Sequence, residues 1–221
     1  MSDIIAFFQA VQSGNASKVE ALLDSNASLA IAKNEKGQSA VLMAVYTGRN
    51  EIRDLLLARG IALELHEAAA AGQLARVKQI VDQDAALANN VSPDGFPVLA
   101  LAAVFGHRDV AEYLFAEGAD VNAVATNGTG YNALTGAVAS GHTSIVAWLL
   151  ANGANPNYRY GDGYSPLLTA AANGHLGIVS LLLASGADLH AKTNDGKTAL
   201  SFAQERGHAE VTDFLRSHGA A

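Results

Sequence analysis

Three groups of residues have types and spacings that could support chemistry. Gly128, Gly130 and Ala133 fit the G-x-G-x-x-G/A pattern with which some proteins hold a dinucleotide pyrophosphate. That chemistry also needs a buried strand before the glycines, a long helix after them and an acidic residue ~20 positions further on. Position 150 is Leu150, its neighbours are apolar, and the helix expected after the glycines is short. The pattern therefore indicates a loop, and we expect no dinucleotide site.

Histidines supply the other two groups. His66 and Glu67 begin like the H-E-x-x-H helix of a zinc protease, but position 70 is Ala70, so the second histidine ligand is missing. Four further histidines each follow a glycine, and they are His107, His142, His175 and His208. Their wide, similar separations would place them in successive layers of a stacked fold rather than around one ion. No serine lies in a G-x-S-x-G context. The sequence thus predicts no catalytic residue, no metal site and no cofactor.

The elements that would position any site are short helices in pairs. In residues 166–188, an alanine-rich apolar run ends at Gly174, and an Ile-Val-x-Leu-Leu-Leu run ends at Gly186. Glycine suits the left-handed conformation in which helices commonly end. Ser165 can cap the first run, and Pro166 suits the first helical position. This stretch therefore predicts two helices joined by a tight turn.

The same sequence pattern recurs along the chain. The glycines that end the first helix of each unit are Gly14, Gly48, Gly72, Gly106, Gly141, Gly174 and Gly207. Subtraction of these numbers gives intervals of 34, 24, 34, 35, 33 and 33. The four Gly-His pairs close four of these helices, and residues 118–123 read Gly-Ala-Asp-Val-Asn-Ala. With these motifs and a period near 33 residues, almost the entire chain resembles the ankyrin repeat family.

The resemblance implies an all-α solenoid of stacked helix-turn-helix units with short β-turn or hairpin fingers. We expect one domain over residues 1–221 with seven units, at 2–34, 35–61, 62–92, 93–123, 124–157, 158–190 and 191–221. The first and last units are expected to be polar caps. The third unit is short, because there is no room for a finger between Gly60 and His66. The helical stack should continue there while one finger is missing.

Composition narrows the classes of partner. The formal net charge of -7 argues against binding to nucleic acid, which would favour a basic stripe. The absence of cysteine excludes disulfides and thiolate chemistry and fits a reducing compartment. The first residues lack the basic region of a signal peptide, and no apolar run approaches the ~20 residues that span a bilayer. We therefore expect a cytoplasmic protein that binds neither nucleic acid nor membrane.

The resemblance also indicates which residues could bind a partner. In the family, the residues beside the turn glycine and those before the helix-ending glycine face the concave side. Aromatic and acidic residues gather at these positions here: Tyr46, Asp94, Phe96, Phe105, Tyr131, Tyr160, Asp162 and Tyr164. Tyrosine and phenylalanine are favoured as rigid interface anchors. We interpret these residues as a protein-binding surface; the alternative is that the rings only pack on neighbouring turns.

The resemblance implies a non-catalytic protein–protein interaction module, an adaptor or scaffold. We expect an aromatic, mildly acidic groove over units four to six, selective for a partner with exposed apolar and basic groups. Two alternatives stay open. One is a small-molecule or enzymatic site at the short third unit, near His66 and Glu67. The other is a structural protein that associates with itself, although a monomer with at most weak self-association is expected.

Overall fold

The computed structural model describes residues 2–35 and 37–220, and over these residues the chain is helical. Fourteen α-helices follow one another as seven pairs. The first helices of the pairs are α1 (Ser2–Ser13), α3 (Ala40–Tyr46), α5 (Leu65–Ala70), α7 (Val98–Val104), α9 (Ala133–Ala139), α11 (Pro166–Ala172) and α13 (Ala199–Glu205). The second helices are α2 (Ala16–Ser25), α4 (Asn50–Ala58), α6 (Leu74–Val81), α8 (Arg108–Ala116), α10 (Thr143–Ala151), α12 (Leu176–Ala184) and α14 (Ala209–Ser217). Two 3₁₀ helices, η1 (Ala27–Ile31) and η2 (Ala85–Asn89), follow α2 and α6.

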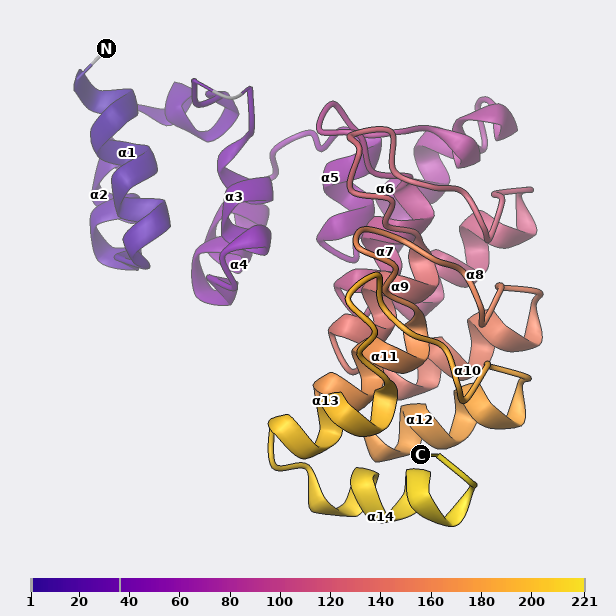
Figure 1. The fold of residues 1–221 in the computed structure, drawn as a ribbon. Coiled ribbons are helices and arrows are strands. Elements are labelled where there is room, and N and C mark those ends of the chain that lie inside the picture. The colour runs from indigo at the N-terminus through magenta and orange to yellow at the C-terminus, as the bar shows by residue number, and fades with distance from the viewer. Residues whose placement is uncertain (1, 36, 221) are drawn as a thin grey trace.

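The pairs stack on one another, which confirms the expected helical solenoid. First helices pack against the first helices of adjacent pairs, as α5 does on α7 and α7 on α9. Second helices pack in the same way, as α10 does on α12. In Figure 1, α1–α4 stand to one side of the longer stack formed by α5–α14, with a thin connection before α5.

A continuous apolar core runs through the whole stack. Its fully buried side chains come from successive pairs and include Phe7, Leu56, Leu114, Leu149 and Leu168. The α-helices have only six to twelve residues, and isolated helices of that length are marginal in water. Burial against the neighbouring pairs therefore holds each layer in its helical conformation.

Histidines link the layers at the ends of the first helices. His107, His142 and His208 each donate an Nε2–H hydrogen bond to a carbonyl oxygen of the preceding pair, at 3.0 to 3.1 Å. The acceptor of His107 is Ala70, the last residue of α5. Near the N-terminus, Arg49 has the corresponding role, since its Nε donates to the carbonyl oxygen of Gln12 at 3.2 Å. These bonds join neighbouring pairs at one edge of the stack.

The burial of the His107 ring makes the stability of the protein depend on pH. Burial lowers the pKa of His107 below its ordinary value of 6.5, so the folded state holds a neutral ring. The unfolded chain takes up a proton there as the pH falls below about 6.5, and the folded state then loses stability. We expect the free energy of unfolding in urea to drop less between pH 7.5 and pH 5 for His107→Gln than for the unaltered protein. An equal drop in both proteins would contradict this assignment.

Polar side chains cap most of the first helices. Ser165 Oγ accepts from the amide of Leu168 at 3.4 Å, whereas Pro97 precedes α7 without any side-chain cap. At α9 the cap is reciprocal and buried: Asn132 Oδ1 accepts from the amide of Thr135, and Thr135 Oγ1 accepts from the amide of Asn132, both at 2.9 Å. These two hydrogen bonds hold the start of α9 in place.

Short fingers precede most of the first helices. Isolated antiparallel bridges join Lys33 to Ser39, Val91 to Pro97, Tyr160 to Tyr164, and Lys192 to Thr198. Before α9 the amide of Ala125 donates to the carbonyl oxygen of Tyr131 at 2.7 Å. Residues 61–64, which lead into α5, form no such bridge. The third pair therefore has no finger between those of its neighbours.

Candidate functional site

An apolar groove of about 400 Å³ opens where α3, α7 and α9 meet two fingers. Its lining residues are Tyr46, Phe96, Ala100, Leu101, Val104, Phe105, Tyr131, Asn132, Thr135, Gly136 and Ala139. Four of them are aromatic residues that the sequence assigns to the binding surface. We call this feature the aromatic groove. Its polar residues Asn132 and Thr135 already bond to each other in the cap of α9, so the groove offers mainly carbon surface.

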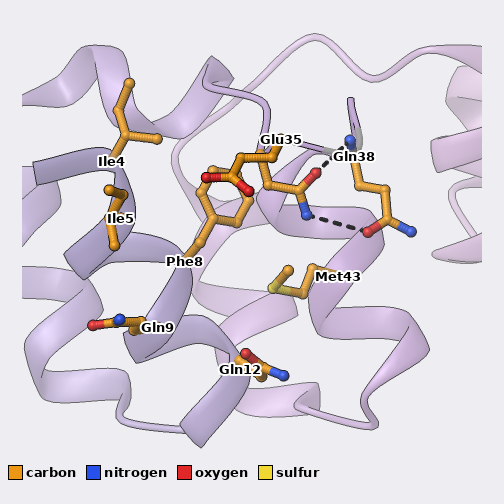
Figure 2. Close-up of a pocket in the computed structure, with 9 residues that line it drawn as sticks. Ile4, Ile5, Phe8, Gln9, Gln12, Glu35, Gln38 and Met43 are labelled. Atoms are coloured by element: carbon orange, nitrogen blue, oxygen red, sulfur yellow. Dashed lines mark hydrogen bonds between the residues drawn. The ribbon is translucent and has the colours of Figure 1, made fainter. Parts of the chain in front are cut away.

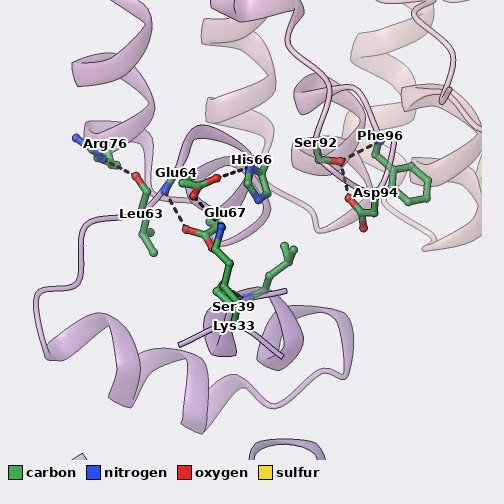
Figure 3. A network of polar contacts seen from close by, with 11 residues as sticks. Lys33, Ser39, Leu63, Glu64, His66, Glu67, Arg76, Ser92, Asp94 and Phe96 are labelled. Carbon is green, nitrogen blue, oxygen red and sulfur yellow. Dashed lines mark hydrogen bonds and ion pairs between the residues drawn. The ribbon is translucent and has the colours of Figure 1, made fainter. Parts of the chain in front are cut away.

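Tyr46 forms one wall of the aromatic groove and contacts a pair that is not its neighbour. Its ring stacks on that of Phe105, with centroids 5.5 Å apart and planes 16° apart. Its hydroxyl donates to Asp94 Oδ2 at 2.8 Å. Burial and this bond raise the pKa of the Tyr46 phenol, which therefore stays neutral and keeps its donor. Ser92 donates to the other carboxylate oxygen of Asp94 at 2.6 Å (Figure 3).

A second set of rings continues from the aromatic groove toward the C-terminal pairs. Tyr131 contacts Tyr160 with centroids 5.5 Å apart, and Tyr160 lies 6.3 Å from Tyr164. Tyr164 packs on Phe202 at 5.6 Å, and Tyr158 stacks on Tyr160 at 6.3 Å. Burial raises the pKa of Tyr160, whose hydroxyl also bonds to Thr169. Tyr158 and Phe202 are not among the predicted binding residues, although Tyr158 stands only two residues before Tyr160.

The structure brings most of the predicted binding residues together. Tyr46, Phe96, Phe105 and Tyr131 line the aromatic groove, and Asp94 adjoins it through the hydroxyl of Tyr46. Tyr160 and Tyr164 belong to the adjoining ring set. Asp162 does not line the groove; its side chain is exposed, and its carbonyl oxygen accepts from the amide of Asn194 at 2.8 Å.

The exposure of these rings bears on both interpretations made from the sequence. Tyr131 is 45% exposed, while Tyr46, Phe96, Phe105 and Tyr164 are half-buried. The rings pack on one another at one edge, as the alternative interpretation expects. They also leave carbon surface open to the groove. Such partly supported rings are rigid, and rigid aromatic rings lose little freedom when a partner covers them.

The residues near the start of α5 form a polar network of a different kind (Figure 3). Glu67 Oε2 accepts from the amide of Glu64 at 2.9 Å, which is one half of a capping box for α5. Lys33 pairs with Glu64 at 3.0 Å, and its hydrogen bond lowers the pKa of the Glu64 carboxyl. His66 Nδ1 lies 3.7 Å from Glu64. Glu67 thus caps the start of α5, and Glu64 is held by Lys33.

The role of Glu67 as a cap can be tested by two substitutions. Glu67→Gln keeps an oxygen acceptor for the amide of Glu64, so we expect the free energy of unfolding to change by less than about 0.5 kcal/mol. Glu67→Ala leaves that amide unpaired and is expected to cost about 1–2 kcal/mol. Urea unfolding followed by circular dichroism measures both values. Equal losses would show that the negative charge, not the acceptor, matters at this position.

A smaller groove of about 280 Å³ lies at the N-terminal end, between α1 and the finger at residues 33–39 (Figure 2). Ile4 and Ile5 are 38% and 52% exposed on α1, beside polar Gln9 and Gln12. The first helix is therefore less polar at this end than a cap is expected to be.

The described residues contain no cluster of three or more potential metal ligands. Among the helices that the structure describes, none is both long enough and apolar enough to cross a bilayer.

A family model described as ankyrin repeats (3 copies) matches residues 65–160 and 134–221, which together make up more than half of the chain. No curated protein matches the sequence.

Proposed function

Because the chain belongs to the ankyrin repeat family, whose repeats are generally protein–protein interaction modules, we propose that it binds a partner protein and catalyses no reaction itself. The proposed binding surface is the aromatic groove and the adjoining rings, with Tyr46, Asp94, Phe96, Phe105, Tyr131, Tyr160, Asp162 and Tyr164 as its residues. The proposal treats residues 1–221 as one domain of seven units that acts as a monomeric adaptor. It places the protein in the cytoplasm, where a chain without cysteine needs no oxidising environment.

The observation that carries this proposal is the aromatic groove itself. Four rings from separate elements converge on about 400 Å³ of apolar space, and Tyr131 remains 45% exposed. Aromatic side chains at the centre of an interface commonly contribute most of the binding free energy. The net charge of -7 favours a partner that presents basic as well as apolar groups.

The proposal is tested by affinity capture from the source cell, with mass spectrometry of the retained proteins. We expect Tyr131→Ala combined with Tyr164→Ala to abolish retention of at least one protein that the unaltered chain retains. Tyr113→Ala is the matched control, because Tyr113 lies on α8 and hydrogen-bonds to Asp82 outside the aromatic groove. Circular dichroism verifies that the variants are folded. Unchanged retention by the folded double variant would show that the partner binds elsewhere.

Self-association is the second candidate, and the exposed Ile4 and Ile5 favour it. Exposed apolar side chains that lie together commonly mark an interaction surface. Sedimentation velocity at two concentrations separates this candidate from a monomeric adaptor. A concentration-dependent dimer that Ile5→Ser abolishes would support it, and a monomer at both concentrations would exclude it under those conditions.

A further inference from the structure

We propose that the aromatic groove is a composite pocket for one bulky apolar side chain of the partner, flanked in the partner sequence by lysine or arginine. Tyr46 forms one wall of this pocket and reaches it across the third pair, which has no finger. This inference rests on the proposed function and specifies what occupies the site. Three observations support it: the contacts of Tyr46, the lining of the groove and the charge of Asp94.

The composite wall follows from the short third pair. In a solenoid each layer normally contacts only its immediate neighbours. Tyr46 in the second pair instead contacts Phe105 and Asp94 in the fourth, and its hydrogen bond to Asp94 spans 48 positions of sequence. Residues 61–64 form no finger, and α5 ends in small alanines at the level of Tyr46. The missing finger therefore leaves the space through which the Tyr46 ring reaches the groove.

The lining selects an apolar occupant. A volume of about 400 Å³ lies at the lower end of the range for small-ligand pockets, ~300–1,000 Å³, and is ample for a phenylalanine, leucine or methionine side chain. A polar metabolite would find few hydrogen-bond partners, because Asn132 and Thr135 are engaged in the cap of α9 and the Tyr46 hydroxyl is engaged by Asp94. An apolar side chain needs no such partner.

The charge beside the groove selects the neighbours of that side chain. Asp94 is the only Asp, Glu, Lys or Arg in residues 89–106 and 121–141, the two segments that form most of the groove. Its carboxylate accepts from Tyr46 and Ser92. No lysine or arginine in the described part of the chain forms an ion pair with it. A basic residue beside the apolar anchor would supply that charge, and its alkyl stem would pack on the rings.

The test uses the purified full-length chain, labelled for NMR, and three acetylated, amidated pentapeptides with terminal glycines. Their central residues are Lys-Phe-Lys, Lys-Ala-Lys and Glu-Phe-Glu. We expect the Lys-Phe-Lys peptide to bind at least about tenfold more tightly than the Lys-Ala-Lys peptide, because the phenylalanine ring is buried. We expect it to bind about three- to tenfold more tightly than the Glu-Phe-Glu peptide at low salt. Its ring should show nuclear Overhauser effects to Tyr46 and to the Val104 methyl groups.

Two matched charge variants separate Asp94 from the overall negative charge. Asp94→Asn should remove most of the preference for lysine over glutamate and leave the preference for phenylalanine over alanine intact. Asp213→Asn makes the same charge change on exposed α14, far from the groove, and should leave both preferences unchanged. Tyr46→Phe keeps the ring that forms the wall and should retain the preference for phenylalanine. Tyr46→Ala should reduce that preference several-fold.

Four results would overturn the inference. They are equal binding of the phenylalanine and alanine peptides, tighter binding of the glutamate peptide, ring contacts to Phe96 and Tyr131 without Tyr46, and groove signals that shift with protein concentration in the absence of peptide. The last result would identify a second copy of the chain as the occupant.

The peptides test the pocket without a cellular partner. Failed capture with intact peptide binding would therefore contradict the proposed function alone. Capture that depends on Tyr131 and Tyr164, without peptide binding at the groove, would contradict this inference alone.

Discussion

Replacing Gly72 by alanine is expected to destabilise the protein by about 1.5–3.5 kcal/mol. Gly72 follows α5 with a φ of +70°, a conformation that costs other residues roughly 1–2 kcal/mol. A Cβ atom there would also lie 2.4 Å from Nδ1 of His107 and 2.6 Å from its Cε1. The ring can retreat only by giving up its hydrogen bond to Ala70, which adds about 0.5–1.5 kcal/mol. Urea unfolding followed by circular dichroism measures the loss.

Gly48 provides a matched control for this substitution. It follows α3 in the same place with a φ of +66°, but a Cβ atom there meets no other atom within 4 Å. Gly48→Ala should therefore cost only the backbone strain, about 1–2 kcal/mol. In a background of His107→Ala, Gly72→Ala should fall to that same value, because the colliding ring is gone. Equal costs for both glycines in the unaltered background would show that the histidine ring yields without penalty.

The regular features of the fold could be predicted from sequence because they are local and repeated. The glycines that end the first helices have positive φ, and His107, His142 and His208 after them bind the preceding layer. Pro97 precedes its helix without a capping hydroxyl, as its side chain requires. Each of these features follows from one residue type at one position of the repeat. Aligning the repeats in the sequence is therefore enough to predict it.

The candidate site was only partly predictable, because it depends on the third pair, where the repeat lacks its finger. The repeat register places Tyr46 two residues before Gly48 and Phe105 directly before Gly106, in units two pairs apart. It cannot indicate that their rings stack, because residues two layers apart do not normally touch. The missing finger of the third pair was visible in the spacing of the glycines, but its consequence for Tyr46 needed coordinates. Asp162 shows the converse, since the repeat register groups it with the groove residues although it does not line the groove.

Tyr46 should therefore control how firmly the first two pairs are attached to the rest of the stack. Tyr46→Ala removes a ring stack worth about 0.5–1.5 kcal/mol and a hydrogen bond to a carboxylate worth about 1.5–3 kcal/mol. Because α3 packs less extensively on α5 than α5 does on α7, and the Lys33–Glu64 ion pair across this junction is exposed, few other contacts replace this one. We expect a loss of about 2–4 kcal/mol at this junction. Hydrogen exchange of the native protein, measured by mass spectrometry, should therefore accelerate in α1–α4 by more than about tenfold.

The pattern of exchange distinguishes a junction from an ordinary core contact. Because layers of a solenoid unfold by nearest-neighbour rules, exchange in α11–α14 should be unchanged in Tyr46→Ala. Tyr46→Phe retains the stack on Phe105 and leaves Asp94 bonded to Ser92, so its effect should be well below that of the alanine variant. Faster exchange throughout the stack would mean that the chain unfolds as one unit and that Tyr46 is only one contact among many. Acceleration confined to α1–α4 would mean that one tyrosine both encloses the groove and fastens the N-terminal pairs to it, so that an occupant of the groove stabilises that attachment.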